Sequence, residues 1–179
     1  MKNLIITMVI LTTAIVHPSC AQTVSNPVVI DSTSVFSSVV NSYMELKDNL
    51  AKDQANNARI AAKSLYDAIG NVPMDKMPSD QHEVWMKYNE KLSYDAEHIK
   101  GTDEIDHQRE HFISLSSNMY KLLKELNVHT ADLYYQYCPM ANDNKGAYWI
   151  SQQSKIVNPY MGKKMLSCGS TKETLKAKQ

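Results

Sequence analysis

Residues 102–127, TDEIDHQREHFISLSSNMYKLLKELN, carry the pattern that decides the fold. Apolar side chains recur there at spacings of three and four residues, which is the spacing of an amphipathic α-helix. This face consists of Ile105, Phe112, Leu115, Met119, Leu122 and Leu126, with Arg109 in the same row. Thr102 or Asp103 is the expected start, and Asn127 is a suitable C-cap. We therefore predict a long helix whose apolar face packs on other helices.

Two further helical patterns precede this one. The nearer stripe comprises Val84, Tyr88, Leu92, Asp95 and Ile99, and it ends at Gly101. The earlier pattern runs from Val35 to Ile69 and ends at Gly70. Long amphipathic helices joined by short loops pack antiparallel most simply. We predict a mainly α fold, an antiparallel bundle of three long helices.

The character of the sequence changes after His129. The stretch is rich in tyrosine and is punctuated by Pro139, a run from Asn142 to Gly146, and Pro159. It predicts an irregular C-terminal segment with room for a short hairpin or helical turns. We expect one helical-bundle domain over 32–170, closed by residues 132–170, and a polar tail at 171–179. His129 is expected to be structural rather than a ligand.

The N-terminus has the features of an export signal. Lys2 is followed by an apolar run over 4–16, which is too short to span a bilayer but suits a signal peptide. Small residues favour cleavage after Ala21, so we expect a signal peptide at 1–21 and a disordered lead-in at 22–31. The alternative is a lipoprotein cut before Cys20, although the preceding histidine and proline suit it poorly. A periplasmic or secreted protein is expected.

Composition excludes some classes of function. The chain has 19 Lys and Arg against 19 Asp and Glu, and no basic stripe is visible, so nucleic acid is not an expected partner. After Ile30 there is no apolar run long enough to cross a membrane. With five glycines, the chain offers no glycine-rich phosphate loop.

Two charges fall on the predicted apolar stripes. Asp95 and Arg109 lie at similar distances on either side of the turn at Gly101. A charged side chain that faces a core needs a partner, because moving the charge out of water costs free energy unless an opposite charge or hydrogen bonds compensate it. We predict that Asp95 pairs with Arg109, with Asp53 as a competing partner for the arginine.

Residues 107–111, HQREH, match the H-x-x-E-H motif of inverted zinc peptidases. With 3.6 residues per turn, His107 and His111 point about 120 to 160° away from the apolar face. A peptidase also needs a third protein ligand and a cleft, and the sequence indicates neither. We expect surface histidines and no enzymatic activity.

The two cysteines beyond the signal, Cys138 and Cys168, leave two chemistries open. In an oxidising compartment they would form a disulfide closing a loop of about 30 residues, which is worth ~3–4 kcal/mol. Each cysteine, however, lies near a methionine, Met140 or Met165. Thiolates and thioethers are soft ligands that select Cu(I) or Ag(I). The alternatives are thus a disulfide or plain thiols, and a metal site of Cys138, Met140, Met165 and Cys168.

Four C-terminal stretches resemble a known family. They are YQYCPMA (135–141), KGAYWIS (145–151), IVNPYMG (156–162) and KMLSCG (164–169), and QREHF (108–112) agrees with the same family upstream. The family comprises exported domains of unassigned function from Bacteroidetes-type bacteria, alone or fused to heavy-metal efflux adaptor proteins. The pattern C-P-M-A, N-P-Y-x-G, M-L-x-C-G is also similar to the C-terminal segment of copper/silver efflux periplasmic adaptor subunits. The resemblance covers about Val35 to Leu175.

The resemblance implies heavy-metal handling, with Cu(I) or Ag(I) as the metal, and no enzymatic reaction. Since no adaptor hairpin or barrel domain is visible, we expect a free-standing relative whose partner is a heavy-metal efflux adaptor or pump. The expected role is binding of Cu(I) or Ag(I) in the cell envelope for efflux or sequestration. The alternative is a structural or protein-interaction module clamped by a Cys138–Cys168 disulfide. The oligomeric state stays open.

Overall fold

The computed structural model describes residues 35–127 and 129–178. The expected signal peptide (1–21) and lead-in (22–31) lie outside these residues. The described chain is mainly helical, with four α-helices followed by a three-stranded sheet. The helices are α2 Ser37–Ala51, α3 Ala55–Gly70, α4 Ser79–Lys100 and α5 Ile105–Leu126; the strands are β1 Leu133–Cys138, β2 Ala147–Ser151 and β3 Ser170–Leu175; 3₁₀ turns cover Met74–Lys76 and Gly162–Lys164.

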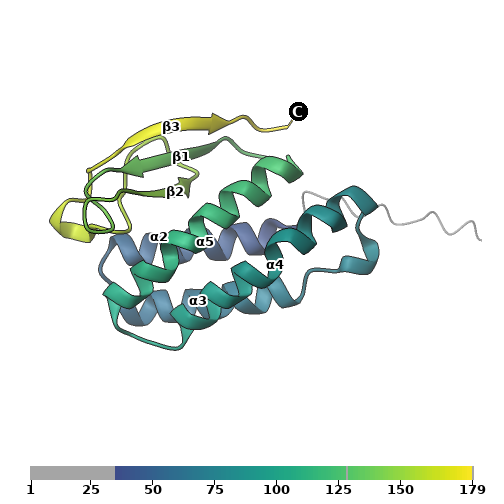
Figure 1. Ribbon diagram of the computed structural model, residues 1–179, viewed down its shortest axis with the longest axis horizontal. Helices are drawn as coiled ribbons and strands as arrows, with labels where there is room; N and C mark the ends of the chain where they lie inside the picture. The colour runs from purple at the N-terminus through teal and green to yellow at the C-terminus, as the bar shows by residue number, and fades with distance from the viewer. Residues whose placement is uncertain (1–34, 128, 179) are drawn as a thin grey trace, which may run out of the picture.

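The four helices form a bundle, and the sheet lies over the side of the bundle that α5 occupies (Figure 1). Each helix turns one apolar face inward, as amphipathic helices do when packing supplies most of their stability. The buried centre includes Leu46, Leu65, Leu92 and Leu115, one from each helix. The helical part of the prediction is therefore confirmed, but the number of helices is not.

The predicted first helix is two helices. α2 ends at Ala51 and α3 begins at Ala55, with Asp53 in the left-handed conformation at φ 57° between them. The prediction of three long helices was wrong here because both halves bury an apolar face at helical spacing, so periodicity does not reveal the turn. Two helix ends were predicted correctly, with α3 ending at Gly70 and Asn127 forming a left-handed cap after α5 at φ 50°. The start of α5 was predicted at Thr102 or Asp103, but the helix begins at Ile105.

The C-terminal segment is more regular than predicted. Its antiparallel sheet has the order β2-β1-β3, so β1 is central. Residues Ser170–Leu175, which the sequence assigned mostly to a polar tail, form β3. This strand was missed because it lies at an edge and, of its six residues, Leu175 alone is buried, which leaves no apolar alternation to detect.

The free edge of β2 is joined to the bundle by two tyrosines. The Ile150 N–H donates to Tyr43 Oη at 3.1 Å, and Tyr160 Oη donates to the Tyr148 carbonyl at 2.5 Å. Tyr43 Oη also lies 2.7 Å from Ser116 Oγ of α5. Burial raises the pKa of both phenols, so they remain neutral hydrogen-bonding groups. These contacts satisfy strand groups that would otherwise be left unpaired.

The predicted Asp95–Arg109 pair does not form. Arg109 instead pairs with Asp53, the competing partner, at 2.6 Å, and donates to the carbonyls of Leu50 at 3.0 Å and Pro159 at 2.9 Å. Asp95 accepts a hydrogen bond from Ser114 on α5. The error follows from the break after α2, because the turn it creates places Asp53 and a free helix-end carbonyl within reach of the guanidinium.

None of the helices in the described ranges is long and apolar enough to cross a membrane.

Candidate metal site

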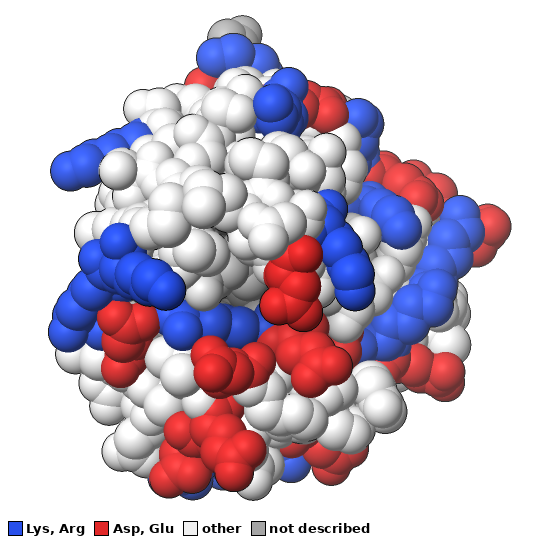
Figure 2. All heavy atoms as spheres, turned by 60° about the vertical axis from the view of Figure 1, so that its left-hand side comes forward, with Lys and Arg blue, Asp and Glu red and all other residues white. Residues whose placement is uncertain are grey.

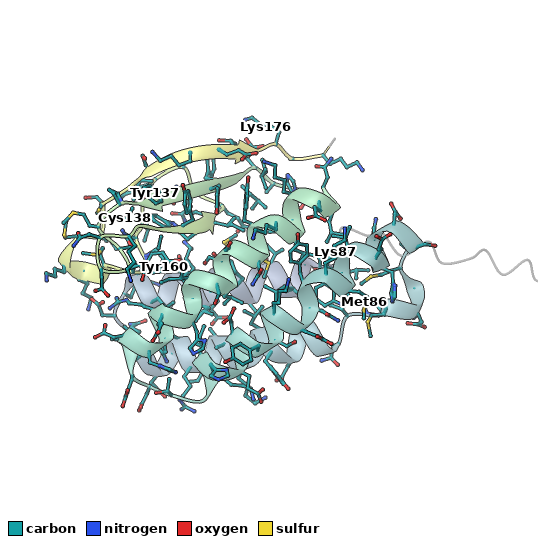
Figure 3. The ribbon with its side chains drawn as sticks, in the orientation of Figure 1. Met86, Lys87, Tyr137, Cys138, Tyr160 and Lys176 are labelled. Atoms are coloured by element: carbon teal, nitrogen blue, oxygen red, sulfur yellow. The ribbon has the colours of Figure 1, made fainter. Side chains whose placement is uncertain are left out.

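The fold brings Cys138 and Cys168 together. Cys138 is the last residue of β1 and is buried, and Cys168 stands two residues before β3 and is partly exposed. Because Tyr137 pairs with Ser170 in the β1–β3 ladder, the two cysteines meet at its end. Both are free thiols, and the thiol of Cys168 lies close enough to that of Cys138 for the two to influence each other's ionisation. Figure 3 shows Cys138 where the strands run into the connecting loops.

The thiol pair has a shared electrostatic environment. The neighbouring Cys138 thiol, followed by burial, raises the pKa of Cys168, while the backbone N–H of Met140 acts in the opposite direction. Two adjacent sulfurs disfavour a second negative charge, so Cys168 remains a thiol at neutral pH. A bound cation would supply the charge that favours both thiolates, and its binding would release protons.

Gly169 allows the segment that carries Cys168 to lie close against β1. Its φ is 137°, and a Cβ there would lie 2.8 Å from the Tyr137 carbonyl oxygen and 2.9 Å from the Trp149 ring. A side chain would push the segment away from β1 and carry Cys168 with it. Glycine at this position therefore serves the thiol contact as well as the entry into β3.

Asn158 holds the loop that carries Cys168. Its Nδ2 donates to the Cys168 carbonyl at 2.7 Å, and its backbone N–H donates to the Leu166 carbonyl at 2.8 Å. Its Oδ1 accepts from the N–H groups of Tyr160 at 2.9 Å and Met161 at 3.1 Å. The side chain is fully buried. Sequence reasoning assigned Asn158 no role, since its partners lie in irregular backbone that no periodicity describes.

The two predicted methionine ligands lie beside the thiols along the backbone. The Met140 backbone lies near enough to the Cys168 sulfur to lower the pKa of that thiol, and the Cys168 N–H donates to the Met165 carbonyl at 3.0 Å. Met140, which is 45% exposed, and Met165 both line an open groove of about 970 Å³. Met161 lines the same groove, so a third thioether lies at this end of the molecule.

The groove lies between the sheet loops and α5. Its other walls include Arg109, Tyr160 and the 141–145 loop, whose residues Asn142, Asp143 and Asn144 all have positive φ. Figure 2 shows this end of the molecule, with acidic side chains gathered in the lower half and an uncharged area at the centre of the upper half that Lys and Arg side chains surround. The groove carries both basic side chains (Arg109, Lys145 and Lys164) and acidic ones (Asp106, Glu110 and Asp143) around its thioethers.

His129 is structural, as expected. It is buried at the start of the sheet, and its ring Nε2 lies 2.9 Å from the Lys176 carbonyl. It precedes β1, whereas Cys138 ends β1, so the whole length of the strand separates them. His129 therefore fastens the end of the chain and takes no part in the sulfur cluster.

The His107/His111 pair lies on α5, away from the cysteines in sequence and in fold. His107 is 43% exposed, as predicted, but His111 is only 16% exposed and its Nδ1 lies 3.2 Å from Asp95 Oδ1. Within the described ranges, no group of three or more His, Cys, Asp or Glu side chains is arranged to hold a metal ion. The sulfur cluster is of another kind, with two thiols and neighbouring thioethers.

A protein family described as being of unknown function, DUF3347, matches residues 39–131, which are more than half of the 179-residue chain. The chain belongs to this family. The DUF3347 match covers the helical bundle and stops before β1, so it leaves the Cys138–Cys168 segment outside. No curated protein and no solved structure matches the chain.

Proposed function

We propose that this DUF3347 protein binds a soft monovalent metal, Cu(I) or Ag(I), through the thiolates of Cys138 and Cys168. The observation that carries the proposal is the contact between these two thiols at the end of the β1–β3 ladder. Thiolates prefer soft cations, and two of them from a rigid strand and an anchored loop give a site that is largely formed before the metal arrives.

Met140 and Met165 complete the proposed ligand set. Both border the groove; the Cys168 N–H donates to the Met165 carbonyl, and the Met140 backbone lies near the Cys168 sulfur. Thioethers bind Cu(I) and Ag(I) but carry no charge, so they would complete the coordination without adding to the negative charge of the two thiolates. In this role the groove is the path by which the metal enters and leaves.

The cellular role follows from the resemblance of the C-terminal segment to copper/silver efflux adaptors. We propose a non-enzymatic protein of the cell envelope, exported by the signal at 1–21, that delivers the metal to an efflux adaptor or pump or sequesters it. Membership of a family without an assigned function is compatible with this role but does not argue for it.

The same contact supports a second candidate. Adjacent thiols can be oxidised to a disulfide, two electrons and two protons passing to a thiol oxidant of the envelope. The protein would then be a structural or interaction module clamped between Cys138 and Cys168. Whether the protein binds metal or is a disulfide-clamped module depends on whether Cys138 and Cys168 are reduced or oxidised in the protein that the cell produces.

The deciding experiment is thiol counting followed by anaerobic Cu(I) titration against a chromogenic chelator. Two free thiols and uptake of one Cu(I) per chain, lost in Cys168→Ser, are expected. Cys168 is the better position for this change because it is partly exposed, whereas Cys138 is buried. A stable disulfide combined with no uptake after reduction would exclude the metal role.

A matched pair of methionine variants tests the thioethers. Met140→Leu removes a sulfur from a half-exposed side chain at nearly constant volume and should weaken Cu(I) binding. Met86→Leu is the control, because Met86 is similarly exposed at 50% but lies on α4, far from Cys138 in Figure 3. Equal Cu(I) affinities of the two variants would remove Met140 from the site.

A further inference from the structure

Three histidines gather where α4 and α5 pack together, and none of them lines the groove that holds Met140 and Met165. His98 comes from α4, and His107 and His111 come from α5. The ring centroids of His98 and His111 are 4.4 Å apart, and those of His107 and His111 are 4.8 Å apart. Tyr94 packs on the His98 ring at 4.1 Å. Neither the family match nor the proposed Cu(I) role uses these side chains.

Hydrogen bonds fix which ring nitrogens are free. His98 Nδ1 lies 2.9 Å from the Tyr94 carbonyl oxygen, which can only accept, so Nδ1 carries the proton. His111 Nδ1 lies 3.2 Å from the Asp95 carboxylate, which likewise accepts. In the neutral ring, Nε2 then keeps its lone pair. Both imidazoles are therefore set in the tautomer that binds a metal through Nε2.

Asp95 gives the cluster a buried negative charge. Its Oδ1 also accepts from Ser114 Oγ at 2.8 Å, and no lysine or arginine of the described ranges pairs with it. A carboxylate behind a histidine is the arrangement that orients metal-binding imidazoles and raises their basicity. A cation held by the rings would also offset the cost of burying Asp95.

We infer that His98, His107 and His111 form a binding site for a borderline divalent cation such as Cu²⁺ or Zn²⁺. Imidazole nitrogen suits these metals, and a histidine pair four residues apart on one helix face is an established way to hold them. Three imidazoles leave a fourth position for solvent. The site is independent of Cys138 and Cys168, which take the soft monovalent metal.

The rings must rotate to close the site. They stack at present, with 26° between the planes of His98 and His111, and as they now stand no three His, Cys, Asp or Glu side chains of the described ranges could hold a metal ion. With metal–nitrogen distances of about 2.0–2.1 Å, the coordinating nitrogens of a tetrahedral site are about 3.3 Å apart. His107 is 43% exposed and has room to turn, whereas His98 must shift against the Tyr94 ring on which it packs; the hydrogen bond to Asp95 holds His111 in place.

The test is a Cu²⁺ titration of the full chain carrying Cys20→Ser, Cys138→Ser and Cys168→Ser, which removes all three thiols that would bind or reduce the metal. One Cu²⁺ per chain is expected, with an electron paramagnetic resonance spectrum showing imidazole nitrogens. Adding His98→Ala and His107→Ala should weaken binding by more than about 100-fold, since loss of a supporting group alone costs about 10- to 100-fold. These changes leave the His111–Asp95 contact intact.

His82→Ala, at an exposed position of α4 outside the cluster, is the matched control and should leave the affinity unchanged. A second measurement needs no substitution: Zn²⁺ added to the wild-type protein should shift the imidazole ¹⁵N resonances of His98, His107 and His111 but not of His82. Unchanged Cu²⁺ affinity in the His98/His107 variant, or Zn²⁺ shifts confined to other histidines, would overturn the inference. Neither result bears on Cu(I) binding by the thiols.

Discussion

Arg109 of α5 binds Asp53 of the α2–α3 turn at 2.6 Å, and the same guanidinium holds the Pro159 carbonyl at 2.9 Å. Gly162 packs against this pair so closely that a Cβ there would lie 1.8 Å from Asp53 Oδ1. The Lys163 N–H donates to Asp53 Oδ2 at 3.0 Å. One ion pair thus fixes the turn of the bundle and the loop before Cys168 to each other.

Arg109→Met should lower the free energy of unfolding by about 2–4 kcal/mol, because it removes several hydrogen bonds from a charged donor and leaves carbonyls unpaired. Chemical denaturation measures the change. Arg59→Met is the control, since Arg59 is exposed and its side chain bonds to Asn56, and it should change stability by less than about 0.5 kcal/mol. Similar effects of both variants would contradict the role given to Arg109 in joining the α2–α3 turn to the loop before Cys168.

The pH dependence of stability should include a contribution from Asp53. Its pKa lies below the ordinary value, chiefly through the Lys163 N–H and also through Arg109. A depressed pKa in the folded state gives stability that is present above the unfolded pKa and is lost as pH falls through the folded pKa. Urea midpoints measured below about pH 4 should fall more steeply for the wild type than for Asp53→Asn. Parallel curves would show that the contact is too weak to matter.

Gly169→Ala should displace the loop from β1 and separate the thiols. The reason is a Cβ placed 2.8 Å from the Tyr137 carbonyl, at a φ of 137° that L-residues rarely adopt. Loss of stability should accompany faster alkylation of Cys138 than in the wild type. Gly70→Ala is a good control because nothing lies within 4 Å of its added Cβ. If Cys138 stayed as protected as before, Gly169 would have no part in holding the site.

Tyr43→Phe should cost about 1–3 kcal/mol, because the Ile150 N–H at the edge of β2 would lose its buried partner. The effect should be visible in thermal unfolding and in faster hydrogen exchange of that amide. Tyr94→Phe removes a hydroxyl from a side chain that is 56% exposed, and little change is expected. A slowly exchanging Ile150 amide in Tyr43→Phe would contradict the role given to this hydroxyl.

Cu(I) affinity should rise with pH if Cys168 is a ligand. Its raised pKa means that binding must displace a proton near neutrality, so each proton released should add up to about tenfold in apparent affinity per pH unit. Competition titrations between about pH 6 and pH 8 measure this slope. An affinity independent of pH would mean that the thiol is not a ligand.

The helical part of the fold was accessible from sequence because Phe112, Leu115 and Met119 repeat at the period of a helix. The turn at Asp53 was not accessible from sequence, because the apolar residues before and after it continue the same helical spacing. The Asp95–Arg109 error followed from this, since partners were chosen along one hairpin while the arginine had another neighbour in space. Which charged side chains pair depends on the distances between helices, and the spacing of residues along one helix does not give those distances.

The candidate sulfur residues were named from soft-ligand chemistry, and the structure brings Cys138 and Cys168 together. Their neighbourhood was not predictable in the same way. Asn158 and Gly169 matter through hydrogen bonds and close approach in irregular backbone, where no repeating pattern marks them. The role of Asp95 behind His111 also required the contact between α4 and α5.

The position of β3 has a consequence for the order of assembly. It is the last strand along the chain, yet it forms one side of the central strand β1. Pairing across this ladder joins residues some forty positions apart, and Tyr43 and Ile150 are 107 positions apart. Contacts between such distant positions form late, because long loops must close first. We therefore expect the two thiols to become neighbours late in folding, after the residues of β3 up to Leu175 have been synthesised.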